Sequence, residues 1–359
     1  MAYYSGEALR LSVFGESRGD AVGLRLEGLP EGLSVDLPAL QCFLDRRAPG
    51  RNPWSSTRKE PDQLQLLSGL CQGMTTGEPL TVLLANKDAP QKTPRTVLRP
   101  GHADWPAYLK YGEIPAGGGK FSGRLTAPLC VAGGICLQLL RQRGIRIGAH
   151  ILSVSGVSDT AFDPMMPELS VLNGKAFPVL DDAAGRIMIA EIEAAKAAED
   201  SVGGTVECAV VGLPAGLGDH LWDGTESRLA PLLFGIPGVR GLFFGNGFAA
   251  AKLRGSENND PLYLQNGSII AHSNRHGGIL GGMTTGLPLL FTAAFKPTPS
   301  IGAPQNSVDI STMTETTVCT CGRNDPCIVP RAVPVVEAAA AIVIYDLLRS
   351  SAADSADGS

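Results

Sequence analysis

One eight-residue segment occurs twice in this chain, and it restricts the folds that the chain can adopt. Residues 73–80 read GMTTGEPL, and residues 282–289, which begin 209 positions later, read GMTTGLPL. Each copy leads into an apolar run typical of a buried strand, TVLLAN and LLFTAAF. The spacing is far too long for a solenoid repeat. The copies are either similar turns that arose by chance or a duplicated β-turn-β unit, and the duplication predicts one intertwined, pseudo-symmetric domain.

Other segments predict both strands and helices. The runs LRLSVFGE and VGLRLEGLP are typical of paired strands. Asp36, followed by Pro38, predicts the start of a helix that ends at Ala48. The loop RNPWSSTRKEPD after it is too polar to be core. Further helices are predicted in residues 126–144, 185–200 and 333–350. We therefore expect one α/β or α+β domain over residues 1–350 and a disordered tail over 351–359.

Composition excludes several classes of protein. The 359-residue chain carries a net charge of −5, which argues against a general nucleic-acid binder. No run of about 18 apolar residues and no apolar N-terminal signal core occur, so no membrane segment is expected. The eight cysteines are scattered, which predicts reduced thiols in the cytoplasm. His272 and His276 have metal-like spacing, but no matching pair completes a zinc site, so no metal is expected.

Four polar clusters interrupt the apolar pattern, and each is rich in arginine, lysine or glycine. They are GESRG at 15–19, DRRAPG at 45–50, RPGHAD at 99–104 with GGGKFSGRLT at 117–126, and KPTPS at 296–300 with GRNDPC at 322–327. Each has an ordinary explanation: His102 could be a satisfied turn histidine, and Asp325 could start a turn. Together, glycines followed by cations at the start of a helix predict a site for an anion. His102 and Asp325 are the plausible proton carriers.

In this order, the clusters resemble the chorismate synthase family. The matching stretches are FGES-Arg18-GDAVG, FLDRRAPG, RPGHADW, GGGKFSGRLTAPL, GGILGGMTTG, FKPTPSI and GRNDPCIVPRAVPVVEA, within residues 10–349. The resemblance implies a β-α-β sandwich with internal pseudo-symmetry, assembled as a homotetramer. It also implies a lyase that removes phosphate and a ring proton from 5-enolpyruvylshikimate 3-phosphate to give chorismate, the last common step of the shikimate pathway. The reaction is redox-neutral but requires reduced FMN.

The resemblance also assigns roles to individual positions. The FMN contacts would be Lys120, Phe121, Ser122, Gly238, Gly281, Lys296, Pro297, Thr298, Pro299, Ser300 and Arg323. Arg47 matches a position assigned to NADPH, and Arg46, Arg99 and Arg124 match the basic lining around the substrate. His102 matches the histidine thought to protonate the reduced flavin, and Asp325 matches the carboxylate thought to accept a proton through it. Because no reductase domain is recognisable, we expect an external electron source.

This chain departs from the family pattern in the GESRG and GRNDPC motifs. Arg18, next to Ser17, stands where the family has the histidine credited with protonating the leaving phosphate, and Asn324 stands where His or Ser is usual. Arginine stays charged, so Arg18 cannot be a practical general acid, but it can hold phosphate through two parallel hydrogen bonds. We therefore expect the GESRG motif to form a corner of the active site, in which Arg18 is an electrostatic substitute for the histidine. The alternative is a catalytically weak paralogue that binds flavin or a shikimate-type ligand.

Overall fold

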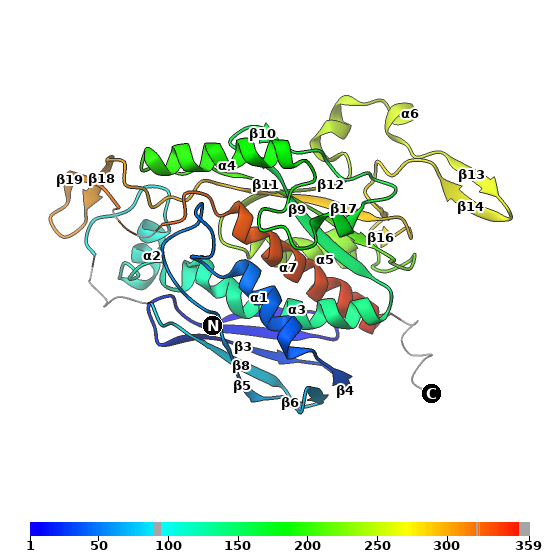
Figure 1. The fold of residues 1–359 in the computed structure, drawn as a ribbon, viewed down its shortest axis with the longest axis horizontal. Helices are drawn as coiled ribbons and strands as arrows, with labels where there is room; N and C mark the ends of the chain where they lie inside the picture. Colours follow the sequence, from blue (N-terminus) through cyan, green and yellow to red (C-terminus); the bar gives the residue numbers. More distant parts are fainter. Residues whose placement is uncertain (89–94, 321, 323, 352–359) are drawn as a thin grey trace.

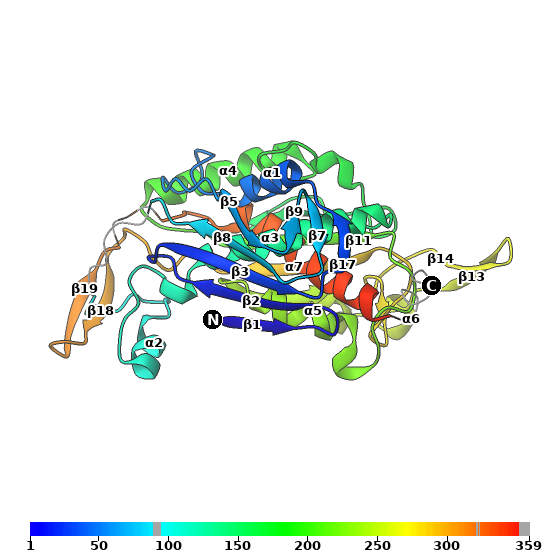
Figure 2. The ribbon, with the colours of Figure 1, turned by 90° about the horizontal axis from the view of Figure 1, so that it is seen from below.

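The computed structural model of the chain describes residues 1–88, 95–320, 322 and 324–351. Two five-stranded antiparallel sheets enclose a layer of helices (Figure 1; Figure 2 shows the first sheet from below). The first sheet has the order β1 (Ala2–Ser5), β2 (Arg10–Gly15), β3 (Ala21–Glu27), β8 (Leu80–Ala85) and β5 (Leu64–Ser68). The second has the order β10 (Val157–Ser158), β9 (Arg146–Val154), β11 (Gly204–Val211), β17 (Leu289–Phe295) and β12 (Val239–Phe244). The expected β-α-β sandwich is confirmed.

Helices fill the space between the sheets and cover the outside of the second one. The inner layer contains α1 (Leu37–Arg47), α3 (Thr126–Gln142) and α7 (Val329–Ser350), and α5 (Thr225–Phe234) packs beside α7. The outer helix is α4 (Asp182–Ala197). Shorter helices are α2 (Asp104–Tyr111), α6 (Gly255–Asn258), and the 3-10 turns η1 (Gly119–Phe121), η2 (Gly123–Leu125), η3 (Leu169–Leu172), η4 (Leu221–Asp223) and η5 (Gly247–Lys252).

Four smaller sheets of the described residues lie outside the two main sheets. One contains β4 (Glu31–Ser34), β7 (Met74–Thr76) and β6 (Leu70–Cys71). Three hairpins are formed by β13 (Leu262–Gln265) with β14 (Ser268–Ala271), β15 (Ile279–Leu280) with β16 (Met283–Thr284), and β18 (Gln305–Asp309) with β19 (Thr314–Val318). The β13–β14 hairpin projects well away from the body of the molecule (Figure 1).

Most of the predicted elements are confirmed. Strands β2 and β3 pair, and α1 begins after Asp36, whose carboxylate accepts the N–H of Ala39 at 2.9 Å. Helix α3 begins at the predicted Thr126. Helix α4 begins before its predicted start because Asp181 caps it by accepting the N–H of Ala183. Helix α7 also begins earlier, at Val329, since a proline is compatible with the first turn of a helix.

The duplicated segment is a repeated structural unit, not a coincidence. In each copy a short strand and a turn precede a long buried strand, β7 before β8 and β16 before β17. Thr75 donates to the carbonyl of Pro30 at 2.5 Å and accepts the N–H of Leu33 at 2.8 Å. In the other half, Thr284 donates to the carbonyl of Pro214 at 2.7 Å and accepts the N–H of Leu217 at 2.9 Å. The pseudo-symmetry therefore includes a second pair of similar segments, GLPEGL at 28–33 and GLPAGL at 212–217, which the sequence analysis missed.

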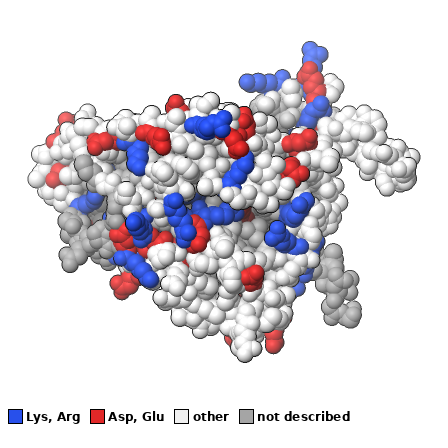
Figure 3. Space-filling view, in the orientation of Figure 1, with Lys and Arg blue, Asp and Glu red and all other residues white. Residues whose placement is uncertain are grey.

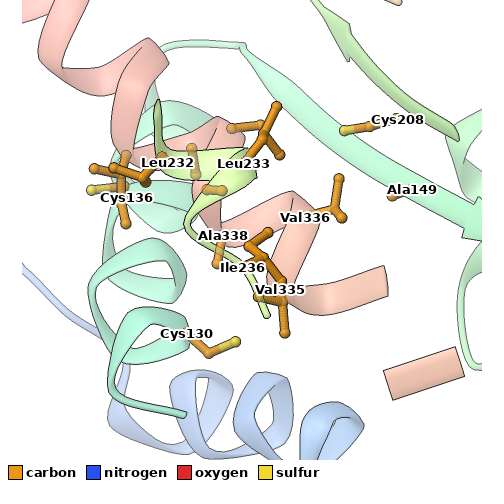
Figure 4. Packing of buried hydrophobic residues seen from close by; sticks show 14 of the residues in the cluster. Cys130, Cys136, Ala149, Cys208, Leu232, Leu233, Ile236, Val335, Val336 and Ala338 are labelled. Carbon is orange, nitrogen blue, oxygen red and sulfur yellow. The ribbon is translucent and has the colours of Figure 1, made fainter. Parts of the chain in front are cut away.

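The core between the sheets depends on a close approach of α3 and α7. A Cβ atom at Gly133 would lie 2.3 Å from the Cα of Ala338, so only glycine fits there. Figure 4 shows buried side chains of both helices, including Cys130 of α3 and Val335 and Ala338 of α7. The segment Gly123–Gln142 is long and apolar enough to cross a membrane, but 72% of its most apolar window is buried, as in the core helix of a globular protein.

Candidate active site

A cavity of about 810 Å³ lies where the polar clusters meet. Its walls come from segments 17–18, 47–58, 95–103, 117–126, 235–238, 295–300 and 324–335, which belong to both halves of the duplication. Thr126 at the start of α3 and Arg331 in the first turn of α7 line the wall. The unpaired N–H groups at helix N-termini favour bound anions.

The cavity wall is strongly basic although the chain is acidic overall. Among the described residues, nine Lys or Arg and two Asp line it, whereas the whole chain has a net charge of −5. The cations are Arg18, Arg47, Arg58, Arg95, Arg99, Lys120, Arg124, Lys296 and Arg331. On the outer face in Figure 3, basic and acidic side chains are instead interspersed. A concave wall with such an excess of positive charge concentrates the field inside the cavity and attracts a multiply charged anion.

Two of these arginines are held by one buried carboxylate. Asp62 has a fully buried side chain, and its oxygens accept hydrogen bonds from Arg47 (2.6 Å) and from Arg124. Burial alone would raise the pKa of Asp62, but Arg47 and Arg124 hold it below its usual value. Arg124 also donates to Asn86 at 2.8 Å. The two guanidinium groups are therefore fixed in place with only one of their charges neutralised.

His102 and Arg99 share a second buried carboxylate. Asp104, the first residue of α2, is fully buried, and it accepts bonds from Arg99 Nε at 2.8 Å and Nη2 at 2.7 Å. His102 Nδ1 lies 2.7 Å from Asp104 Oδ1. Burial would raise the pKa of Asp104, but hydrogen bonds from Arg99 and His102 hold it well below its usual range. Asp104 itself does not line the cavity, whereas its two partners do.

Asp325 is held on another part of the wall, four residues before α7 begins. Its Oδ1 accepts the N–H of Ser56 at 2.9 Å, and its Oδ2 accepts a hydrogen bond from Arg331. Arg331 also donates to the carbonyl of Arg47 at 3.0 Å. The carboxylate therefore has a fixed orientation at the cavity wall.

The two lysines of the cavity are also anchored. Lys296 donates to the carbonyl of Gly101 at 2.5 Å and so joins the segment after β17 to the turn that carries His102. Burial and the nearby Arg240 lower the pKa of Lys296. Lys120 Nζ lies 3.2 Å from the ring centroid of Tyr111, a cation–π contact.

Arg18 packs against the glycine-rich loop. A Cβ atom at Gly117, whose φ is +63°, would lie 2.7 Å from Arg18 Nε, so the close approach requires glycine. Nearby, the buried hydroxyl of Ser17 has no hydrogen-bond partner among the described residues, and the same holds for Thr298 and Thr320. All three line the cavity. Buried hydroxyls without partners indicate a site built for a ligand with hydrogen-bonding groups.

The structure brings most of the predicted site residues to this one cavity. Those on its wall are Ser17, Arg18, Arg47, Arg99, His102, Lys120, Phe121, Ser122, Arg124, Gly238, Lys296, Pro297, Thr298, Pro299, Ser300 and Asp325. Arg323 lies outside the described residues. In particular, Lys120, Arg124, Lys296 and Asp325 face the same space although they are far apart in the chain.

Two predicted residues lie elsewhere. Arg46 does not reach the cavity wall, because its guanidinium pairs with the buried Glu337 of α7 at 2.6 and 3.0 Å. Glu337 also accepts the N–H of Ala149, so Arg46 connects α1, α7 and β9. Gly281 lies in the turn between β15 and β16, away from the cavity of its own chain. We therefore leave Arg46 and Gly281 out of the contacts proposed below.

Sequence reasoning missed the residues that hold the site from behind. The loop RNPWSSTRKEPD was expected to be too polar for the core, but Ser55, Ser56, Glu60 and Asp62 are buried. The two carboxylates are accommodated because each is paired, Asp62 with two arginines and Glu60 with Arg58. A carboxylate flanked by basic motifs is a weak signal of this arrangement, and the pairings themselves arise only in the fold.

Neither a metal site nor a disulfide is apparent in the part of the chain that is described. No group of three His, Cys, Asp or Glu residues there could hold a metal ion, and the seven described cysteines are unpaired. The arrangement of fixed cations, a carboxylate-bound histidine and a second carboxylate is that of an enzyme cavity for a phosphorylated, multiply anionic ligand.

Comparisons with known proteins identify the family. The family model for chorismate synthase matches residues 9–348. A chorismate synthase of Thermococcus kodakarensis is 44% identical over 353 residues, 97% of this chain and 98% of that protein. One of Thermococcus gammatolerans is 45% identical over 354 residues, with the same coverage of 97% and 98%. A solved crystal structure of chorismate synthase superposes with a TM-score of 0.76 at 26% identity, covering 96% of this chain and 93% of that one. This chain belongs to the chorismate synthase family, a family of lyases.

Proposed function

We propose that the basic cavity converts 5-enolpyruvylshikimate 3-phosphate to chorismate and inorganic phosphate. The observation that carries the proposal is the convergence of nine Lys or Arg side chains from distant segments on one cavity. The substrate has two carboxylates and a phosphate, and fixed guanidinium groups stabilise both the bound anion and the departing phosphate. The substrate contacts in this proposal are Arg99 and Arg124, with Arg18 at the leaving phosphate. Ser17 is beside it and offers its unpartnered hydroxyl.

Reduced FMN is the cofactor in this proposal, and the composition of the cavity fits a phosphate-bearing group. Its contacts would be Lys120, Phe121, Ser122, Gly238 and the run Lys296–Ser300, all on the cavity wall. When bound, reduced FMN supplies electron density that assists the loss of phosphate. The unpartnered hydroxyl of Thr298 lies within this set and could accept or donate a hydrogen bond.

The proton carriers are His102 and Asp325. His102 holds a proton at Nδ1 toward Asp104, which leaves Nε2 for exchange with the cavity. Asp325 accepts the proton lost from the substrate ring, and Ser56 N–H and Arg331 keep its oxygens in place. Arg18 replaces proton donation by electrostatic stabilisation, which is sufficient in this proposal because phosphate can leave as the dianion. No feature of the comparisons or of the described residues favours a catalytically weak paralogue.

Four further proposals concern the wider context of the enzyme. An external reductant supplies electrons to the flavin, and NADPH could contact Arg47 only through a small part of its surface, since that side chain is 3% exposed. The chain assembles as a homotetramer, which is supported by the apolar β13–β14 hairpin with Leu262, Leu264 and Ile269 70–78% exposed. Residues 1–350 form one domain, supported by one continuous core cluster across both sheets. The reduced thiols support a cytoplasmic location.

An anaerobic turnover assay tests the proposed function. Purified protein, chemically reduced FMN and 5-enolpyruvylshikimate 3-phosphate should yield chorismate and phosphate in equal amounts, and oxidised FMN should not support the reaction. Micromolar binding of the substrate without release of chorismate would instead favour the paralogue that only binds.

A further inference from the structure

Asp104 lies behind the cavity wall and contacts two residues of that wall, Arg99 and His102. Its side chain is 0% exposed, and it does not line the cavity. Oδ2 accepts the backbone N–H of Arg99 at 3.0 Å and Arg99 Nε at 2.8 Å. Oδ1 accepts Arg99 Nη2 at 2.7 Å and lies 2.7 Å from His102 Nδ1. One buried carboxylate therefore fixes both the plane of a guanidinium group and one nitrogen of an imidazole.

This contact determines which nitrogen of His102 carries the proton. The carboxylate of Asp104 can only accept, so the hydrogen between Oδ1 and Nδ1 belongs to His102. Arg99 Nη2 lies 3.2 Å from the same Nδ1, but an arginine nitrogen can only donate, so it cannot accept the hydrogen of Nδ1. In its neutral form His102 consequently has a hydrogen at Nδ1 and a lone pair at Nε2. No described residue partners Nε2, and His102 lines the cavity.

We propose that Asp104 is a positioning residue of the active site, which fixes the tautomer of His102 and the orientation of Arg99. With the lone pair at Nε2, His102 can take a proton from the cavity and return it at the same atom. With the other tautomer, the nitrogen that is not bound to residue 104 would carry a hydrogen and could not accept. This role rests on the proposed function, because it matters for turnover only if His102 exchanges a proton there.

The tautomer can be measured in the protein without any ligand. Histidine labelled with ¹⁵N gives separate NMR signals for protonated and lone-pair ring nitrogens, and the chain contains only five histidines. The signals of His102 are assigned by their loss in His102→Gln. In the neutral ring we expect Nδ1 to be protonated and Nε2 to show the lone-pair shift. A wild-type protein with the hydrogen at Nε2 would overturn the proposal, whether or not any Asp104 variant folds.

Asp104→Asn tests the role of the carboxylate directly. With its oxygen at the Oδ2 position, asparagine would still accept from the backbone N–H and Nε of Arg99. Its NH₂ group at the Oδ1 position would lose the bond from Arg99 Nη2 and would face His102 Nδ1, which must become the acceptor. We expect the His102 signals to change to the tautomer protonated at Nε2. The matched control is Asp182→Asn, at the first position of α4, where the side chain is 70% exposed and pairs with Lys175. The control should leave the His102 signals unchanged.

Turnover measurements connect the tautomer to catalysis. We expect kcat of Asp104→Asn to fall by about 10²–10⁴-fold, the usual contribution of general acid–base catalysis. A folded variant with the changed tautomer and wild-type kcat would refute the catalytic part of the proposal. If the wild type itself produces no chorismate, the proposed function fails, whereas the NMR result still decides whether Asp104 sets the tautomer of His102.

Discussion

Among the residues that support the cavity, Asp62 is the one for which the loss of charge has the most predictable effect on the free energy of unfolding. Its side chain is 0% exposed, and those of its partners Arg47 and Arg124 are 3% and 2% exposed. The backbone of Asp62 has φ +47°, a left-handed conformation that asparagine also tolerates. Asp62→Asn therefore removes the charge with little change in shape or backbone strain.

The expected loss is large because two guanidinium groups remain buried without their carboxylate. Removing one partner of a buried ion pair typically costs about 3–5 kcal/mol. Asparagine keeps one accepting oxygen, so we expect about 3 kcal/mol less free energy of unfolding, against a usual total of about 5–15 kcal/mol. Urea denaturation at neutral pH measures this difference.

The pH dependence gives an independent check. Because Arg47 and Arg124 lower the pKa of Asp62 in the folded protein, its contribution is complete above the unfolded value of about 3.9. It is lost as the pH falls through the lower, folded pKa. The difference between wild type and Asp62→Asn should therefore be constant near neutral pH and should shrink below about pH 4. Asp182→Asn, whose pair with Lys175 is exposed, should show no such effect.

A stability loss of less than about 1 kcal/mol would refute this reasoning, because it would mean that the arginines do not depend on the carboxylate. A difference that does not change in acid would refute the electrostatic explanation even if the loss were large.

The remaining predictions concern the leaving phosphate, the excluded arginine and self-association. Arg18→His should add an ionisation near pH 6.5 to kcat/KM, with the added activity present below it and lost as the pH rises, and an unchanged pH profile would rule out a role at the phosphate. Arg46→Met should lower the urea midpoint because Glu337 loses its partner, while KM stays within about twofold of the wild-type value. A large rise of KM would mean that Arg46 does contact the substrate. Leu264→Asp should shift sedimentation toward smaller species, and an unaltered assembly would exclude the β13–β14 hairpin as a subunit contact.

The sequence predicts the wall of the cavity better than the supports behind it. Glycines, lysines and arginines in short motifs, such as those at Lys120 and Lys296, are recognisable because the chemistry of anion binding requires those residue types. Asp62 and Asp104 are not recognisable in this way, since their partners are set by the fold. Arg124, for example, is 62 positions from Asp62.

The sequence likewise reveals only part of the duplication. The GMTTG copies are visible because they are nearly identical, whereas the GLPEGL and GLPAGL copies became apparent only through their bonds to Thr75 and Thr284. Their separations from those threonines differ, 45 positions in one half and 70 in the other, because the halves carry insertions of different length. A repeat with unequal internal spacing cannot be aligned by counting residues.

A crystal structure with FMN and 5-enolpyruvylshikimate 3-phosphate bound together tests most directly whether distant basic loops form one reaction site. We predict that both ligands occupy the cavity at the N-terminal ends of α3 and α7, with the substrate phosphate at Arg18 and Arg124 and the flavin against Lys120 and the Lys296–Ser300 run. Flavin bound at a separate site, with the substrate alone in the basic cavity, would contradict the account.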